Sequence, residues 1–584
     1  MKSNRWAAMV GTAWLAGALL GGSAWGQDRE SFPGKKGIQH VLLISVDGMH
    51  AVDFLNCSKG LAGVNGGQPY CPNLAELGET GVNYLDTSTS KPSDSFPGLT
   101  AIVSGGSART EGIFYDVAYD RSLNPPAATT GNGVSAGPCT AGATPIGTRT
   151  EYEEGISFNQ TFLNGIGPNG PDGGRASINP ARLPRDKNCN PVFPWNFVRT
   201  NTIFGVIHAL GGYTAWSDKH PAYLSVSGPG NGNNVDDFYA PEVNSAVVAL
   251  PVNTPEGVPC TPIPDTLQVG SYTDSFTNIK CYDTLKVHAI LNEIDGKAHN
   301  GQPALNGKPA KVPNIFGMNF QAVSVGQKLI EYNDTLGTIF ATGGYLDAIG
   351  TPSEPLLGEF RFIDDSIGEM VTHLKNQGLL QSTLIIITAK HGQSPIDPKR
   401  FFPIPGHSGA NGQTPSSILA AFLPDSEVNQ IGATEDDLSL LWLKDQSQTA
   451  SAVSLLETTS PPNKNVAGIG QIFWGPSLAT MFNPPSQDPR SPDIIVTPNV
   501  GVIYTGSKRK QEEHGGFAHD DTNVIMLLSN PKFTAKTVTG PVETMQVAPT
   551  VLKALGLDPD ELQAVKIDGT QVLPGVNLDI DDTK

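Results

Sequence analysis

Two apolar runs in this sequence are rich in branched aliphatic residues, and charged residues follow each of them at once or after one residue. The run HVLLISV covers residues 40–46 and is followed by Asp47, and the run LIIIT covers residues 384–388 and leads into Lys390 and His391. Continuous apolar runs of this length are typical of strands buried in a parallel sheet, whose carboxyl ends carry the functional groups of α/β proteins. The two runs therefore predict a parallel sheet with a functional site at its edge.

Helical patterns separate the predicted strands. Between residues 359 and 374 apolar side chains recur at helical spacing, and a glycine follows at 378, where the helix is expected to end. Further helices are expected at 71–81, from about 97, at 202–212, at 283–294 and at 545–557, and further strands at 312–320 and 523–531. This alternation predicts an α/β fold with a doubly wound, mostly parallel sheet that carries helices on both faces.

Two long stretches lack this periodic pattern. Residues from about 122 to 200 are rich in Gly, Pro, Asn and Thr, and the simple alternation is lost again from about 404 to 490. We expect both stretches to be loop-rich insertions that form a cap over the strand ends of one catalytic domain, residues 27–584. The sequence DIIVTPNVGVIYT, at 493–505, predicts a return to core strands.

The first 26 residues have the pattern of a secretory signal. Lys2 and Arg5 precede an apolar stretch that ends in small residues around Ala24 and Gly26. The stretch is interrupted by glycines and is shorter than the ~20 apolar residues that a membrane span needs. We therefore expect a periplasmic or secreted protein that begins at about Gln27 and has no membrane span when mature.

The cysteine count agrees with export. All six cysteines lie in the first half of the chain, and an even set of this kind is typical of disulfides made in an oxidising compartment. Among the alternative connectivities we expect pairing between neighbours, namely Cys57 with Cys71, Cys139 with Cys189 and Cys260 with Cys281. A metal cluster is the competing interpretation, but the sequence contains no CxxC pair to support it.

The net charge of −18 argues against a nucleic acid duplex as a partner, because like charges repel a polyanion. One basic stretch, SKRKQ at 507–511, is short and is expected to be an exposed loop.

Side chains with catalytic chemistry gather at the predicted strand ends. Asp47 and His391 follow strands, His514 precedes the strand at 523–531, and Ser95 opens a helix, where backbone N–H groups favour an anion. Ends of parallel strands meet at one edge of a sheet, so these residues are expected to share a pocket. Together they provide the carboxylate, imidazole and hydroxyl groups that hold a divalent cation and activate a serine.

The order of these motifs resembles the alkaline phosphatase superfamily, and within it the type I phosphodiesterase/nucleotide pyrophosphatase branch. The motifs are VLLISVDGM, DSFP, AIVSGGSARTEGIFYD, LIIITAKHGQ and EHGG. The resemblance implies a hydrolase of small-molecule phosphate esters with a Ser or Thr nucleophile and a covalent phospho-enzyme. It also implies a divalent metal cofactor, zinc being the expected ion, with one or two ions bound.

Position by position, the resemblance assigns a role to each of these residues. Asp47 matches a metal carboxylate, Ser95 the nucleophile, where this branch more often has Thr, and His514 the distal metal histidine. His391 matches the histidine of an Asp-His-Gly motif, but Lys390 stands where that motif has its aspartate ligand.

The other half of the first metal site is incomplete under either of two alignments. The resemblance implies an aspartate followed four residues later by a histidine. Those positions fall on Val323 and Gln327, or on Asp347 and Thr351. The histidine is missing from both, and only the second alignment retains a metal carboxylate, Asp347.

Two positions near the site carry a carboxylate where the family branch has another residue. Asp94 stands where the branch has a lysine, and Asp116 where it has a phosphoryl-binding asparagine. We expect one of them to pair with Lys390 or to replace the lost metal ligand. Lys390 is then expected to act as a cation surrogate toward the transferring group. Asp218, Lys219 and His220 follow another predicted strand and are expected to line the substrate pocket.

These predictions combine into an exported, metal-dependent hydrolase of phosphate esters, either a phosphodiesterase or a phosphatase, that uses a serine nucleophile. The alternative is a non-catalytic extracellular binding protein with the same fold and a degenerate metal site.

Overall fold

The computed structural model describes residues 37–156, 174–244, 250–260, 272–333, 337–405, 413–420, 422, 433–458 and 463–578. The predicted signal segment, 1–26, lies outside these residues, as do parts of both predicted insertions. Within the described residues, no helix has both the length and the apolar character that crossing a membrane requires.

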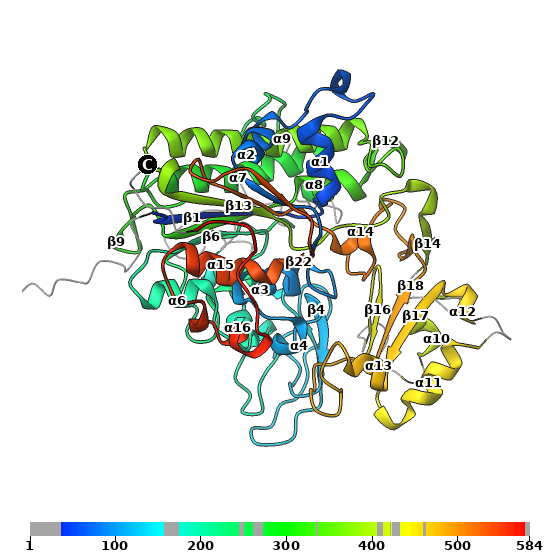
Figure 1. Cartoon of the computed structure of the whole chain (residues 1–584). Helices are drawn as coiled ribbons and strands as arrows, with labels where there is room; N and C mark the ends of the chain where they lie inside the picture. The colour runs from blue at the N-terminus through cyan, green and yellow to red at the C-terminus, as the bar shows by residue number, and fades with distance from the viewer. Residues whose placement is uncertain are drawn as a thin grey trace, which may run out of the picture.

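The core is an eight-stranded sheet with a parallel centre (Figure 1). Its order is β21 (Lys536–Val538), β2 (Val82–Tyr84), β20 (Leu527–Ser529), β13 (Thr383–Thr388), β1 (His40–Val46), β10 (Ile315–Phe320), β6 (Ala215–Ser217) and β7 (Asp237–Tyr239). The strands from β13 to β7 pair in parallel, whereas β20 is antiparallel to both of its neighbours. The predicted α/β fold with a mostly parallel sheet is confirmed.

The central strand β1 is buried on both faces, as its apolar sequence predicts. Val41 and Leu43 point into one hydrophobic core, and Leu42 and Ile44 point into the other. Side chains alternate between the two faces of a strand, so a strand covered on both sides must be apolar at consecutive positions.

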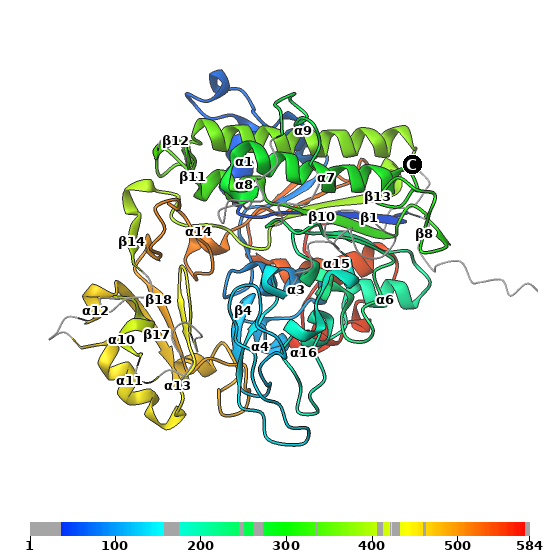
Figure 2. The ribbon, with the colours of Figure 1, turned by 180° about the vertical axis from the view of Figure 1, so that it is seen from behind.

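Helices cover both faces of this sheet (Figures 1 and 2). One face carries α1 (Ala51–Lys59), α2 (Pro72–Glu79), α7 (Phe276–Ile294), α8 (Ala322–Lys328) and α9 (Glu354–Asn376). The other carries α3 (Ser95–Ser104), α6 (Ile203–Ala209) and α15 (Val547–Ala554). All the helices predicted from the sequence are present, although α7 begins seven residues before its predicted start at 283.

A smaller lobe, residues 433–498, lies beside the core (Figure 1, yellow and orange). Its four strands are β15 (Ala433–Glu435), β16 (Ser439–Leu441), β18 (Ile494–Pro498) and β17 (Ile469–Trp474), in that spatial order. The sequence 493–505 therefore does not return to the core sheet as predicted. β18 pairs with β16 and β17, and the next strand, β19 (Val502–Tyr504), pairs with β14 (Phe402–Ile404).

The first predicted insertion is loop-rich where it is described. An antiparallel pair, β4 (Val117–Asp120) with β5 (Thr148–Glu151), leads into and through it. The disulfide Cys139–Cys189 links two of its loops, and Cys57–Cys71 and Cys260–Cys281 complete the predicted neighbour pairing.

Two buried carboxyl groups join the smaller lobe to the core. Asp437 follows β15, and Asp521 lies in the short helix α14 (His519–Thr522) of the core. Burial, followed by the charge of Asp521, raises the pKa of Asp437 well above its usual range. Burial, assisted by the charge of Asp520, also raises the pKa of Asp521, to about 7.

This pair predicts a loss of stability as the pH rises. A carboxyl whose folded pKa exceeds its unfolded value stabilises the fold fully below pH ~4, and this contribution is lost as the pH rises through about 7. Asp521→Asn is therefore expected to recover about 2–4 kcal/mol of unfolding free energy at pH 8 and little at pH 4. Urea unfolding at both pH values measures the effect, with exposed Asp560→Asn as the control. An equal pH dependence in Asp521→Asn and the parent protein would contradict the prediction.

Candidate active site

Asp47 lies at the carboxyl end of β1, where the chain turns sharply. Gly48, directly after it, has a φ of +82°, a conformation that glycine adopts without strain. A Cβ at Gly48 would also meet the side-chain oxygen of Gln327 at 2.1 Å. The turn leaves the Asp47 carboxylate fully buried at the edge of the sheet.

Ser95 is the first residue of α3 and is buried. Asp94 caps this helix, since its Oδ2 accepts a hydrogen bond from the backbone N–H of Phe96. One turn later, Gly98 packs against the backbone of Lys390, whose carbonyl oxygen a Cβ at this position would approach to 2.1 Å. This close contact brings the amino end of α3 to the end of β13.

His391 faces the Ser95 hydroxyl. Its Nδ1 lies 2.9 Å from the carbonyl oxygen of Gly392, so Nδ1 carries the proton and donates it. Nε2 is then unprotonated and lies 3.2 Å from Ser95 Oγ. Burial lowers the pKa of His391, and the charge of Asp47 offsets this only in part. The arrangement makes Nε2 a proton acceptor for Ser95.

Two lysine ammonium groups share this small volume. Lys219 Nζ donates to Ser95 Oγ at 2.9 Å and lies 3.6 Å from Asp47 Oδ2. Lys390 Nζ also lies 3.6 Å from Asp47 Oδ2 and donates to Asp218 Oδ1 at 3.2 Å. Burial is the largest influence on both lysines. It lowers the pKa of Lys390, whereas at Lys219 the carboxylates around it outweigh burial and raise the pKa.

Asp47 Oδ2 is the atom at which these groups meet. It accepts hydrogen bonds from the side-chain amides of Gln321, at 2.6 Å, and Asn319, at 3.3 Å. Burial alone would raise the pKa of Asp47, but the positive charges of Lys390, His391 and Lys219 hold this pKa well below its usual range. Asp47 is therefore a carboxylate at neutral pH.

His514 lies next to His391, with their ring centres 4.0 Å apart. Its Nδ1 is 3.5 Å from Asp94 Oδ1, and neither atom has a hydrogen-bond partner among the described residues. Burial and the charge of His391 hold the pKa of His514 well below its usual range. Burial and the charge of Asp116 hold the pKa of Asp94 well above its own. Both groups are thus driven toward their uncharged forms.

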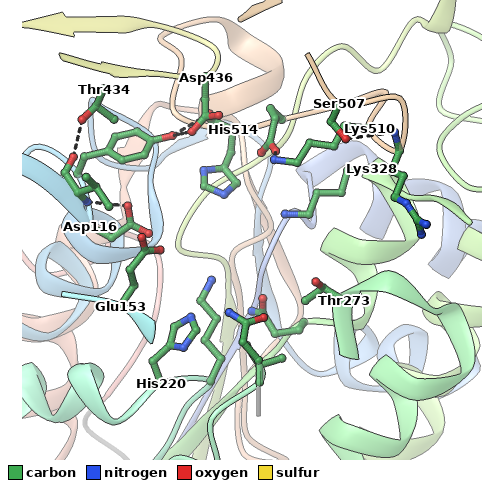
Figure 3. A pocket seen from close by; sticks show the side chains of 18 of the residues that line it. Asp116, Glu153, His220, Thr273, Lys328, Thr434, Asp436, Ser507, Lys510 and His514 are labelled. Carbon is green, nitrogen blue, oxygen red and sulfur yellow. Dashed lines mark hydrogen bonds and ion pairs between the residues drawn. The ribbon is translucent and has the colours of Figure 1, made fainter. Parts of the chain in front are cut away.

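A cavity of about 470 Å³ adjoins this cluster, with Lys219 and His514 in its lining. Figure 3 shows Asp116 on one wall and Lys328 and Lys510 on the opposite wall, with the Lys328 ammonium pointing into the cavity. Lys510 is paired with Glu513, whereas Lys328 forms no ion pair with another described residue. The cavity therefore has an acidic wall and a basic wall.

The residues predicted to bind substrate lie around Ser95 in different roles. Lys219 contacts the Ser95 hydroxyl directly, whereas Asp218 is buried behind it and holds Lys390. His220 lines the cavity, and its Nδ1 is 2.7 Å from Glu242 Oε1.

Of the two roles expected of Asp94 or Asp116, the pairing with Lys390 is wrong. Neither Asp94 nor Asp116 pairs with the Lys390 ammonium, which contacts Asp218 and Asp47 instead. Asp94 Oδ2 accepts the backbone N–H of Asp116 at 3.0 Å. The two new carboxylates therefore lie on the His514 side of the site rather than beside Lys390.

The two alternative positions for the missing metal half-site lie outside the cluster. Asp347 is in the loop before α9, where its carboxylate accepts hydrogen bonds from the backbone N–H and the hydroxyl of Thr351. Val323 is buried in the apolar core, and the Gln327 side chain donates to the Gly48 carbonyl. The structure therefore does not bring Asp347 to Ser95.

Sequence reasoning missed three side chains at the site. Asn319 and Gln321 bind Asp47, and the Lys390 ammonium lies 4.4 Å from the centre of the Tyr223 ring. Asn319 is in β10 and Gln321 directly follows it, so the strand-end rule that identified Asp47 also applies to these two amides. Tyr223 lies in a 3₁₀ helix, Pro221–Ser227, and carries no comparable sequence signal.

Three donors around Ser95 have the spacing of a cation site, but the positive charges beside them do not fit the divalent cation that the resemblance implies. Ser95 Oγ, Asp47 Oδ2 and His391 Nε2 are separated by 3.2 to 3.5 Å, close to the ~3.3 Å edge of a tetrahedral zinc site. The Lys219 ammonium already adjoins this triangle, and Lys390 replaces the fourth, acidic ligand. Among the described residues, no group of three or more His, Cys, Asp or Glu side chains is arranged to hold a metal ion.

The chain is similar to known proteins both in sequence and in structure. Of the solved structures, murine ectonucleotide pyrophosphatase/phosphodiesterase 5 is 14% identical with a TM-score of 0.46, covering 89% of this chain and 96% of its own. Its human counterpart is 12% identical, with a TM-score of 0.44 and coverages of 89% and 95%. The alkaline phosphatase PafA is 11% identical, with a TM-score of 0.49 and coverages of 90% and 97%. A search of curated proteins found no match.

The sequence model of one family matches in two segments. The family is described as type I phosphodiesterase/nucleotide pyrophosphatase, and the match covers residues 41–208 and 341–520. These segments make up more than half of the 584 residues and contain Ser95, His391 and His514. The chain therefore belongs to the type I phosphodiesterase/nucleotide pyrophosphatase family of phosphoric ester hydrolases.

Proposed function

We propose that the protein is an exported hydrolase of small phosphate esters in which Ser95 is the nucleophile. One observation carries the proposal: the Ser95 hydroxyl lies between a proton acceptor, His391 Nε2 at 3.2 Å, and an ammonium group, Lys219 Nζ at 2.9 Å. A serine needs both an acceptor for its proton and a positive charge beside its oxygen to become a nucleophile at neutral pH. Family membership favours diesters as the first substrates to test.

The mechanism uses residues of this chain. His391 Nε2 takes the proton of Ser95 while Oγ attacks phosphorus, so an Oγ–P bond forms and the bond to the leaving alcohol breaks. The alcohol leaves on the face of phosphorus opposite Oγ and takes its proton from solvent, while His391 keeps the proton of Ser95. Lys219 stabilises the negative charge on Oγ, and the backbone N–H groups at the start of α3 favour the phosphoryl oxygens. Water then attacks the phosphoserine at phosphorus, the Oγ–P bond breaks, and the protonated His391 returns its proton to Oγ while a proton of the water passes to solvent. The metal dependence that the resemblance predicts is not part of this proposal.

Export is proposed from two features. The signal-like pattern of residues 1–26 and the three disulfides both favour an oxidising compartment, the periplasm or the exterior of the cell.

Trapping of the intermediate tests the proposal. The protein is mixed with bis(4-nitrophenyl) phosphate, quenched in acid within milliseconds to seconds, and digested for mass spectrometry. We expect a phosphorylated form of the peptide that contains Ser95, and release of nitrophenol. Ser95→Ala is the matched control and should lack both. Absence of modification and of nitrophenol release from the parent protein would instead favour the binding-protein alternative.

The basic wall of the cavity predicts which substrates bind best. Lys328 points into the cavity from the wall opposite Asp116, so a substrate with a second anionic group can reach it (Figure 3). A hydrogen bond to a charged group contributes about 1.5–3 kcal/mol. Lys328→Met is therefore expected to raise the KM of a nucleoside pyrophosphate about 10- to 150-fold relative to that of bis(4-nitrophenyl) phosphate. An unchanged ratio of the two KM values would show that Lys328 does not select substrates.

A further inference from the structure

We infer that Lys219 and Lys390 act as fixed ammonium groups in place of a divalent cation, so that this hydrolase works without a metal. The inference rests on the proposed function, since it concerns the charge beside the Ser95 nucleophile. In this inference Lys219 is a catalytic residue for the reaction at Ser95. Lys390 balances the charge of the site and is a positioning residue.

The position of Lys219 is the first argument. Ser95 Oγ, Asp47 Oδ2 and His391 Nε2 form a triangle in which a cation would sit about 2 Å from each atom. Lys219 Nζ lies 2.9 Å from one corner and 3.6 Å from another. A cation and an ammonium group cannot both occupy so small a volume, because like charges at this separation repel strongly.

Charge balance is the second argument. Four side chains form a connected set: the carboxylates of Asp47 and Asp218 and the ammonium groups of Lys219 and Lys390. Two negative and two positive charges cancel within this set. An added divalent cation would give this buried or nearly buried set a net charge of +2. Asp94 and Asp116, whose charges act on Lys219 more weakly than those of Asp47 and Asp218, would offset it only in part, so the ion would cost free energy.

The fixed position of Lys390 is the third argument. Lys390 is fully buried, and Asp218 and the Tyr223 ring hold its ammonium group. Asp218 is fixed in turn, since its Oδ2 accepts the indole N–H of Trp216 at 3.0 Å. Charges that are held in place before the reaction stabilise the transition state without reorganisation of the site. A bound metal ion provides the same electrostatic stabilisation in other hydrolases.

The second cation position that the resemblance implies, beside His514, also lacks ligands. His514 is retained, but under one alignment its partners fall on Val323 and Gln327, which provide no carboxylate or imidazole. Under the other alignment the remaining carboxylate, Asp347, is bound within its own loop. Asp94 Oδ1 lies 3.5 Å from His514 Nδ1, but this one histidine and one carboxylate make two ligands, fewer than the three protein ligands of a catalytic zinc site.

Metal analysis of the purified full chain tests the inference. We expect well below one equivalent of Zn, Mn, Fe, Mg or Ca by plasma mass spectrometry. Turnover of bis(4-nitrophenyl) phosphate should be unchanged after dialysis against a chelator and after addition of each ion. About one equivalent of a bound ion, together with activity that the chelator removes and the ion alone restores, would overturn the inference.

Substitution of the lysines provides a second readout. Lys219→Met is expected to lower kcat about 10²–10³-fold, and Lys219→Arg, which keeps the charge, should recover part of the loss. Lys297→Met, at a surface lysine paired with Asp295, is the matched control for handling and stability. Equal kcat values for Lys219→Met and the control would overturn the inference. Circular dichroism confirms that each variant is folded.

A variant that gains zinc binding tests the role of the two ammonium charges more specifically than a variant that only loses activity. The double variant Lys219→Met/Lys390→Asp removes both ammonium groups and restores the acidic ligand beside Asp47, Ser95 and His391. We expect it to bind zinc alone in calorimetry, whereas the parent protein does not. Zinc binding by the parent at this site would contradict the inference. Failure of Ser95→Ala to reduce turnover would instead contradict the proposed function, whatever the metal content.

Discussion

Replacing Ser95 with alanine is expected to lower kcat for phosphate esters by about 10⁴-fold or more. The change removes the atom that we propose attacks phosphorus, and the neighbouring His391 and Lys219 have no other group to activate there. Removing a nucleophile that acts as a unit with its base eliminates nearly the whole benefit of both. Steady-state release of nitrophenol measures the effect, and the thermal unfolding temperature should change little because only one oxygen is lost.

Ser95→Thr is the informative companion variant. Threonine keeps the hydroxyl, and it is the residue that the resemblance places at this position more often. We expect activity well above that of Ser95→Ala, although the added methyl must fit in a buried position beside Lys219. Turnover by Ser95→Ala within tenfold of the parent protein would rule out the serine mechanism.

Asp47→Asn is expected to be the most destabilising single change at the site. Asn has nearly the same shape, but it leaves the ammonium groups of Lys219 and Lys390 without the carboxylate that both contact at 3.6 Å. Removing one partner from a buried ion pair costs about 3–5 kcal/mol. Urea unfolding at pH 7 measures the loss of unfolding free energy.

The double variant Asp47→Asn/Lys390→Met tests the cause of that loss. It removes one uncompensated ammonium along with the carboxylate, so we expect it to unfold at a higher urea concentration than Asp47→Asn alone. A loss below about 1 kcal/mol in Asp47→Asn, or no recovery in the double variant, would show that the charges are not coupled as their positions indicate.

The position of the site was predictable from the sequence because strand ends obey a simple rule. Asp47 and His391 follow the apolar runs that became β1 and β13, and these strands are direct neighbours in the sheet. The partner of Lys390 was not predictable in the same way. Asp218 follows β6, two strands away from β1, and only the strand order shows that its side chain reaches Lys390.

The smaller lobe shows a second limit of sequence patterns. The apolar run at 494–498 does form a strand, as its composition predicts, but it pairs within the lobe rather than in the core sheet. Side-chain periodicity indicates whether a strand is buried on one face or on both. It contains no information about which other strand provides the hydrogen bonds.

The two walls of the cavity are formed by different structural parts of the chain. Lys328 ends α8 of the core, whereas Asp116 precedes the β4–β5 pair and Asp436 follows β15 of the smaller lobe. The Ser95 cluster itself belongs to the core elements. Exchanges in the hairpin and the lobe can therefore change the cavity walls without changing the Ser95 cluster. We expect chimaeras that swap only those parts to retain the proposed Ser95 nucleophile and to differ in substrate preference.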